Sequence, residues 1–449
     1  MTGNEEPLLR RLGLGAAFAL VVGTIIGTGV FVKTAVMAQQ AGTPGWVLAA
    51  WAAAGALSLT GALTYAELGA LFPRAGGEYV YMREAYGPAA GFLYGWTRFW
   101  IASPGSIAAY GVGAAKFLSA LAPVAGHQDA AAVALILLFT ALNCLSVAFG
   151  GRLQSALTVL KTAMIAGLAG ALLLAAPGGS WANLAAPAGA GFRGWGLFGA
   201  AVLSALWAFD GWNNLPMAAG EIEDPGRVLP RALGFGMLAV LALYAAANLA
   251  YFHALPFGEI LTSYSTAHRE ALPVAAKAAQ AAFGPGAARL LSAAFVLSAL
   301  GAMNGSILTG ARVPYAMARD GLFFKKLGEV GGGSRVPVLA VAAQGAWSCA
   351  LALSGTFDQL TDYVVFASWI FYALCTAALF VFRRRLPDAP RPYRAPGYPW
   401  VPALFLLGSL LLLANTLRAS PRDSLIGLGF IAAGLPVYFL FRRRLTGPA

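Results

Sequence analysis

Charged residues are scarce in this sequence. Asp, Glu, Lys and Arg together make up 11% of its 449 residues, while 59% are hydrophobic. A typical soluble domain carries about 25% charged residues, so a soluble globule of this size would lack the polar groups to cover its surface. This shortage excludes a soluble enzyme, a disordered protein and a fibrous protein. Apolar runs of about 20 residues, typical of transmembrane helices, fill the chain instead. We therefore predict an all-α membrane protein.

Cysteine and histidine are also rare, with three residues of each. Cys144, Cys349 and Cys375 lie in separate apolar runs, a pattern that gives neither a disulfide framework nor a metal-ligand spacing. The histidines are far apart and form no HExxH pair, which excludes a helix-borne zinc protease. We therefore predict no metal, no cofactor and no enzymatic activity. The N-terminus has no cleavable-signal pattern, so we expect the first apolar run to stay in the mature protein.

Twelve apolar spans can be read, and they predict a single transmembrane domain over residues 1–449. The spans lie at residues 12–39, 45–71, 86–117, 128–149, 153–177, 194–217, 230–254, 287–318, 336–355, 359–382, 399–418 and 424–441. An even number of crossings puts both termini on one side. Of the 30 Lys and Arg residues, 19 fall on that side and 7 on the other. Because basic residues accumulate in cytoplasmic loops, we predict cytoplasmic termini and the inner (plasma) membrane as location. This bias explains the net charge of +12 without nucleic-acid binding.

Two spans contain segments that should interrupt a regular helix. The first span carries three glycines in seven residues, within the sequence GTIIGTGVF at residues 23–31. The sixth span carries FDGWNN at residues 209–214, followed by Pro216. Inside a helix, glycine costs about 1 kcal/mol relative to alanine, and proline about 3 kcal/mol. Unwound backbone within a membrane is tolerated only where protein buries it or where it lines a cavity.

The two interrupted spans lie five spans apart. This spacing predicts two five-helix repeats, residues 12–177 and 194–382, whose orientations are inverted because five is odd. Residues 399–441 form two additional helices outside the repeats. Interrupted helices at matching positions of two repeats are the best sequence indication of a transporter binding site. The alternative interpretation is a pair of glycine-rich packing kinks.

A broken helix presents backbone groups of both signs. A break in the first span exposes the amides of Gly27, Thr28 and Gly29, and the positive end of the helix dipole helps them to attract an anion. In the sixth span, the carbonyls near Trp207 and Asp210 suit a cation. A pocket in which amides face carbonyls matches the carboxylate and ammonium groups of an α-amino acid.

Several motifs resemble those of the amino acid–polyamine–organocation superfamily. GTIIGTGVF is similar to the GxIIGSGIF signature of that superfamily. WAFDGWNN at residues 207–214, GEIEDP and LPR after it, FPRAGGEY after the second span and residues 311–321 resemble its L-type amino acid transporter branch. The resemblance spans most of the chain. It implies the LeuT-type fold, a 5+5 inverted repeat with helices 1 and 6 broken, and transport by alternating access.

The resemblance also implies binding roles for individual residues. Thr28 and Gly29 would hold the carboxylate, the carbonyls of Ile25, Trp207 and Asp210 would hold the amine, and the Trp207 ring would close over the substrate. The predicted substrate site comprises Ile25, Ile26, Gly27, Thr28, Gly29, Trp207, Ala208, Asp210 and Asn213. Charges in the inner loops, such as Glu78 and Glu221, are interpreted mainly as solvated, with a salt-bridge lock as the alternative.

Lys161 lies deep within the fifth span. An ionisable residue inside a membrane is a candidate functional group by default. The resemblance places Lys161 where sodium-coupled relatives bind a cation, so its ammonium would replace the ion and reach the first break near Gly23. A proton-carrying role and a purely structural brace remain as alternatives.

We predict sodium-independent exchange of neutral L-amino acids. The alternatives are a proton-coupled amino acid symporter, a transporter of cationic amino acids or polyamines, and a nutrient sensor that binds without transport. A channel is disfavoured because no TVGYG-like filter segment is present. The predicted partners are an amino acid and the lipid bilayer. In animal members of the branch, a cysteine between helices 3 and 4 attaches a heavy chain. Residues 118–129 here contain no cysteine, so we expect no covalent heavy-chain subunit.

Overall fold

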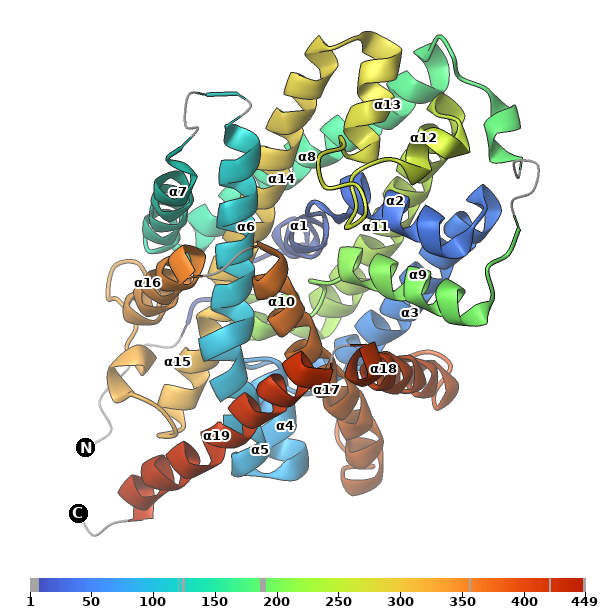
Figure 1. Ribbon diagram of the computed structural model, residues 1–449. Coiled ribbons are helices and arrows are strands. Elements are labelled where there is room, and N and C mark those ends of the chain that lie inside the picture. Colours follow the sequence, from blue (N-terminus) through green and yellow to red (C-terminus); the bar gives the residue numbers. More distant parts are fainter. Residues whose placement is uncertain are drawn as a thin grey trace.

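The computed structural model describes residues 8–119, 121–122, 126–185, 191–354, 357–419 and 421–446. Helices make up the regular secondary structure of these residues, and an isolated bridge joins Leu12 to Ile222. Figure 1 shows the helices arranged around α1 (Leu14–Ile25). The helical class predicted from the sequence is therefore confirmed. Part of the 118–129 loop, for which we predict no heavy-chain attachment, lies outside the described residues.

The first half of the chain contains nine further helical elements. They are α2 (Gly29–Ala41), α3 (Pro44–Leu71), α4 (Glu78–Tyr86), α5 (Pro88–Thr97), the π-helical turn η1 (Arg98–Ala102), α6 (Ser103–Leu118), α7 (Gln128–Asn143), α8 (Val147–Ala175) and the 3-10 turn η2 (Trp181–Leu184). Local sequence explains two of the helix starts. The Thr43 hydroxyl accepts a bond from the amide of Trp46 at the start of α3, and the Ser146 hydroxyl accepts one from Phe149 at the start of α8.

The second half begins with a short broken segment and continues with long helices. Its elements are α9 (Trp195–Ala208), α10 (Asn214–Met217), η3 (Ala219–Glu221), α11 (Pro225–Ala254), α12 (Phe257–Leu261), α13 (Val274–Phe283), α14 (Gly286–Gly310), α15 (Arg312–Arg319), η4 (Lys325–Gly328), α16 (Val338–Ser354), α17 (Phe357–Arg385), α18 (Trp400–Ala419) and α19 (Pro421–Thr446). Each of the twelve predicted spans overlaps one or more of the helices, and the span at 128–149 covers α7 and the first residues of α8.

Helix length and composition identify an integral membrane protein. Six helices among the described residues are long and apolar enough to cross a membrane, and α1 and α2, bent by 41° at their junction, give up to a seventh span. α7, α9 and α16 are shorter apolar helices. The total of twelve crossings stays a prediction.

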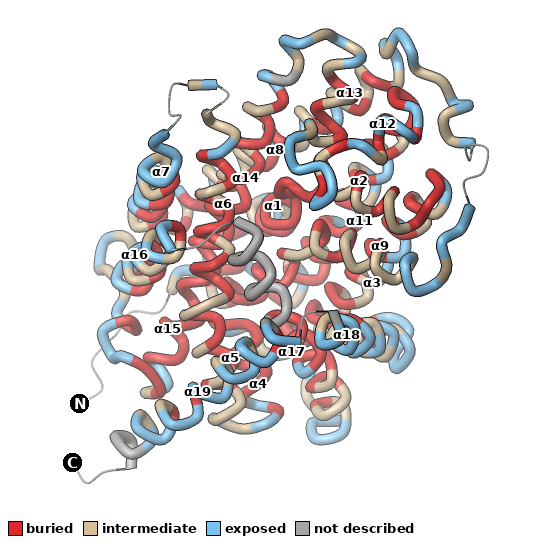
Figure 2. The backbone as a smooth tube through the Cα atoms, in the orientation of Figure 1, coloured by how far each residue is buried: buried red, intermediate tan, exposed pale blue. Residues whose placement is uncertain are grey.

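The helices at the centre of the molecule are buried, whereas the outer helices expose apolar side chains. α1 packs against α8, α11 and α14, and its residues Leu20 and Val21 are fully buried. α18 and α19 instead expose large aliphatic side chains, among them Leu411 and Leu425, and Figure 2 shows both helices at the periphery with many exposed residues. Exposed aliphatic side chains on such apolar helices suit contact with lipid tails.

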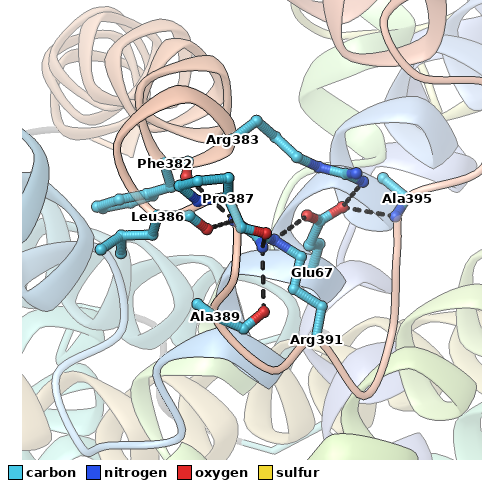
Figure 3. A network of polar contacts seen from close by, with 8 residues as sticks. All are labelled: Glu67, Phe382, Arg383, Leu386, Pro387, Ala389, Arg391 and Ala395. Carbon is cyan, nitrogen blue, oxygen red and sulfur yellow. Dashed lines mark hydrogen bonds and ion pairs between the residues drawn. The ribbon is translucent and has the colours of Figure 1, made fainter.

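A buried carboxylate fixes the segment that follows α17. Figure 3 shows Glu67, in α3, facing two arginines and one backbone amide. Its Oε2 accepts bonds of 2.7 Å from Arg383 Nη2 and from the Ala395 amide, and its Oε1 lies 3.3 Å from Arg391 Nε. Because charge-assisted bonds are stronger than neutral ones, this cluster holds the link between α17 and α18 against α3.

Candidate functional site

The first predicted break is present between α1 and α2. α1 ends at Ile25, Ile26 is extended, and α2 starts at Gly29 after Thr28. The first amides of α2 therefore have no partner one turn earlier in the helix, and they sit at the positive end of its dipole. The predicted interruption thus lies within the GTIIGTGVF segment.

The second predicted break follows α9, which ends at Ala208. Residues 209–213 form turns, and the helix resumes only as the single turn α10. Gly211 has a φ of +120°, and a Cβ there would lie 2.8 Å from the Thr24 carbonyl oxygen. Both the conformation and the space at this position therefore require glycine.

The two breaks touch each other. The Thr24 hydroxyl donates to the Gly211 carbonyl at 2.9 Å. A Cβ on Gly29 would lie only 2.6 Å from the Cβ of Ala208, so the start of α2 lies directly against the end of α9. Segments separated by about half the chain therefore meet in one place.

Tyr244, in α11, bridges the ends of α1 and α9. Its hydroxyl lies 3.0 Å from the Ala208 carbonyl oxygen and 3.3 Å from the Ile25 carbonyl oxygen. The Trp207 carbonyl, in contrast, accepts the Asp210 amide at 3.3 Å. Of the three carbonyls predicted to face an amine, Tyr244 therefore contacts that of Ile25, and the Trp207 carbonyl is bonded within its own turn. The second carbonyl beside the Tyr244 hydroxyl, that of Ala208, was not among the three.

Lys161 reaches the first break from α8. Its side chain is 1% exposed, and its Nζ donates to the Gly23 carbonyl, to the Ile26 carbonyl at 2.6 Å and to the Ser298 carbonyl at 3.3 Å. The Ser298 hydroxyl in α14 donates to the carbonyls of Ile26 and Gly27 at 3.1 and 2.9 Å. One ammonium and one hydroxyl thus satisfy the carbonyls that the break leaves unpaired.

Thr28 and Trp207 line a cavity of about 250 Å³ beside the two breaks. Thr28 is mostly buried. The ring of Trp207 lies under the ammonium of Lys33, with 4.5 Å between Nζ and the ring centroid. The predicted carboxylate-binding residue and the predicted aromatic gate therefore border the same space.

Asp210 and Asn213 belong to a neighbouring polar cluster. The Asp210 carboxylate accepts the Tyr372 hydroxyl at 2.8 Å. Asn213 Nδ2 donates to Glu78 Oε1 at 3.2 Å, and the Tyr94 hydroxyl donates to Glu78 Oε2 at 2.6 Å. The structure thus joins the side chain of Asn213 to the start of α4, between the second and third predicted spans, rather than to the first break.

A buried ion pair joins α15 to the segment before α11, close to the first described residues of the chain. Arg312 Nε and Nη2 bind the two carboxylate oxygens of Glu221 at 2.7 and 2.8 Å, with both side chains almost fully buried. The amides of Arg11 and Leu12 donate to the Glu221 carbonyl at 2.9 Å. The interpretation of Glu78 and Glu221 as solvated charges is wrong, because packing of distant helices buries both carboxylates.

A second contact on this side involves α4, which lies between the second and third predicted spans. Asp320 Oδ2 accepts bonds from the Tyr79 hydroxyl, at 2.8 Å, and from Arg83. Glu84 binds Arg83 at 2.8 Å and Arg74 at 3.0 Å. These contacts connect the loop after α3 to the end of α15.

Three important residues escaped the sequence-based prediction. Ser298 and Tyr244 lie in ordinary apolar helical sequence, so no local pattern singles them out. Lys33 carries a signal, because it is a cation inside an apolar span, four residues after Gly29 and so on the same face of α2.

Comparison with known proteins agrees with this geometry. Residues 12–441 match the family model described as amino acid permease. The serine/threonine exchanger SteT of Bacillus subtilis (strain 168) is 33% identical, over 99% of this chain and 99% of its own. The human b(0,+)-type amino acid transporter 1 is 31% identical over 98% of this chain and 90% of its own, and the human cystine/glutamate transporter is 29% identical over 98% and 88%. The chain therefore belongs to the amino acid permease family of the amino acid–polyamine–organocation superfamily, whose members named here are transporters and exchangers and not enzymes.

Proposed function

We propose that this protein exchanges neutral L-amino acids across the plasma membrane without sodium. The observation that carries the proposal is the contact of the Lys161 ammonium with the carbonyls of the first break. The lysine ammonium at this place supplies the electrostatic balance that a bound cation supplies in a sodium-coupled carrier, so no sodium ion is required for closure.

The proposed substrate site lies at the meeting point of the two breaks. The amides at the start of α2, with Thr28 and Gly29, bind the carboxylate. The Tyr244 hydroxyl has one proton, which it shares between the carbonyls of Ile25 and Ala208, and the free lone pairs of both carbonyls accept bonds from the substrate ammonium. Trp207 closes over the bound amino acid. The remaining predicted residues, Ile26, Gly27, Asp210 and Asn213, shape the site and position its backbone.

The proposed fold is of the LeuT type, with two inverted repeats, twelve crossings and cytoplasmic termini. In such a fold, the arrangement of the two breaks leads to transport by alternating access. The cavity at Thr28 and Trp207 is the outer approach, and the pair of Glu221 and Arg312 closes the inner side. Substrate that bridges the two breaks favours closure of the outer approach. Exchange results if the empty carrier changes state slowly, because only loaded protein then returns. No covalent heavy chain takes part.

Counterflow in proteoliposomes tests this proposal. Purified protein is reconstituted, the lumen is loaded with unlabelled serine or left empty, and the uptake of labelled serine, alanine and leucine is measured in sodium and in choline buffer. Faster uptake into loaded vesicles, equal in both buffers, is the expected result. Equal uptake into empty vesicles would reject obligatory exchange, and a strict need for sodium would reject the role given to Lys161.

The same vesicles separate the other candidate functions. Uptake that depends on an imposed pH gradient identifies proton-coupled symport. Uptake of lysine or arginine that Asp210→Asn abolishes identifies a carrier of cationic amino acids. Binding of serine in a thermal-shift assay without any flux identifies a sensor.

A further inference from the structure

The cavity beside the breaks carries charge of one sign. Among the described residues that line it, Lys33, Lys116 and Arg269 are basic and none is acidic. They come from three separate elements, because Lys33 lies in α2, Lys116 in the last turn of α6 and Arg269 between α12 and α13. The segment between α12 and α13 contacts α2, where Gln39 Nε2 donates to the Ser265 hydroxyl at 3.0 Å. Three distant segments therefore bring positive charge to one space.

Two of these cations are held by aromatic rings. Lys33 Nζ lies 4.5 Å from the centroid of the Trp207 ring, and Lys116 Nζ lies 5.5 Å from that of Tyr264. Both rings also line the cavity. A ring attracts a cation through its quadrupole and leaves the net charge unchanged. The ring contacts therefore orient the two ammonium groups at the wall of the cavity.

Two acidic residues, Glu259 and Glu270, lie close in the chain to residues of the cavity, and neither lines it. The Glu259 carboxylate lies 2.7 Å from Lys277 Nζ, and neither residue lines the cavity. Lys277 is therefore a basic residue on the same side of the molecule whose charge is balanced locally. It provides a matched control for Lys116 and Arg269.

We propose that this cavity is a receiving site for anions that selects amino acids by side-chain charge before they reach the two breaks. Amino acids with a second carboxylate, such as glutamate and aspartate, bind there, whereas lysine and arginine are repelled. A neutral amino acid can also enter the cavity, with its carboxylate pointing toward Thr28. The proposal rests on the proposed amino acid transport and adds an acidic substrate class to it.

The physical basis is the field of a cleft lined by one sign of charge. Such clefts concentrate counter-ions and raise association rates by about 10 to 1,000 fold, and the effect falls steeply with ionic strength. Glutamate carries a net charge of about −1 and lysine about +1 at neutral pH, so the field acts on them in opposite directions. Screening over about 10 Å at 0.1 M salt reduces the difference.

The transport arm of the test uses competition. Proteoliposomes loaded with unlabelled serine take up labelled serine in the presence of external glutamate or lysine, at low and at high ionic strength. Glutamate should inhibit at a concentration about tenfold lower than lysine in low salt, with a smaller ratio in high salt. Lys116→Gln combined with Arg269→Gln should remove most of this ratio. Lys116→Glu combined with Arg269→Glu should reverse it, and Lys277→Gln should preserve it.

A binding arm keeps the result independent of transport. The melting temperature of the purified full-length protein is measured with glutamate, with lysine and with serine, for the wild type and for the same variants. Stabilisation by glutamate that the double glutamine variant loses supports the receiving site, even in protein that shows no flux. Equal effects of glutamate and lysine on the wild type in both arms, or unchanged selectivity in the double variant, overturn it. If the receiving site is overturned but serine counterflow persists, the proposed exchange function still stands. If glutamate binds but no flux is seen, the exchange function is overturned and the receiving site still stands.

Discussion

The ammonium of Lys161 lies 2.6 Å from the carbonyl oxygen of Ile26, the first residue beyond α1. The same carbonyl accepts the Ser298 hydroxyl at 3.1 Å. A buried charge in a membrane is costly unless polar groups surround it, and carbonyls released by an interrupted helix are such groups. The break therefore supplies the carbonyls that stabilise the buried ammonium, and the ammonium in turn satisfies carbonyls that the break leaves unpaired.

Replacement of this lysine tests that relationship. Lys161→Ala leaves the Gly23 and Ile26 carbonyls without their ammonium donor, which should abolish most serine counterflow and lower the free energy of unfolding by about 1–3 kcal/mol. Counterflow in proteoliposomes and thermal unfolding in detergent measure the two effects. Lys277→Ala is the control, because its ammonium binds exposed groups near Glu259. Unchanged flux in Lys161→Ala removes this residue from the mechanism.

The contact between the two breaks gives a second prediction. Gly29→Ala places a methyl group 2.6 Å from the Cβ of Ala208, so α2 and α9 must separate. Overpacking of this kind costs about 1–3 kcal/mol, and the displaced amides should weaken serine binding in the thermal-shift assay. Gly15→Ala, a change inside α1 where a Cβ meets no atom within 4 Å, should leave binding intact. If both variants bind serine equally well, the close approach of the breaks is not needed for the site.

The buried pair of Arg312 and Glu221 gives a third prediction. Removal of one member of a buried ion pair leaves an uncompensated charge and costs about 3–5 kcal/mol. Arg312→Met should therefore lower the melting temperature strongly, and addition of Glu221→Met should restore much of it, because the double variant contains no unpaired charge. A double variant that is as unstable as the sum of the two single variants would contradict this account.

A fourth prediction concerns pH at α4. Partial burial opposes ionisation of Glu84, but the hydrogen bond and charge of Arg83 and the charge of Arg74 lower its pKa below the usual 4.5. A carboxyl whose pKa is lower in the folded state stabilises the fold above the unfolded-state pKa, and this stabilisation is lost as the pH falls through the folded-state value. Glu84→Gln should lower the melting temperature slightly at about pH 7, since exposed pairs contribute little, and the difference should fade as acidification protonates Glu84 in the wild type.

The control for this measurement is Glu329→Gln, a change at an exposed residue in the loop after η4. This change leaves the contacts of Glu84 with Arg83 and Arg74 in place, so it tests whether the loss of those contacts causes the effect. A difference between Glu84→Gln and the wild type that persists unchanged at the lowest pH would show that the ion pairs are not its cause.

Local composition was sufficient to predict the long apolar helices and both interruptions, but not the short helices α4, α12 and α13 between the predicted spans. Each apolar run excludes water along its own length, and glycine or proline weakens the helix at its own position. The break within residues 26–28 and the end of α9 at Ala208 therefore appear where the sequence predicts them. Lys161 was identifiable for the same reason, because one ammonium within an apolar run is conspicuous without knowledge of its partners.

Contacts between distant helices could not be predicted from such local patterns. Tyr244 joins the ends of α1 and α9, and Asn213 faces Glu78, only because of how the helices pack. Burial of Glu221 against Arg312 has the same origin. A hydrogen bond extends over about 3 Å, so helix rotation and crossing angle decide each partner. The sequence by itself determined which groups need a partner, and only the tertiary structure decided which partner each of them has.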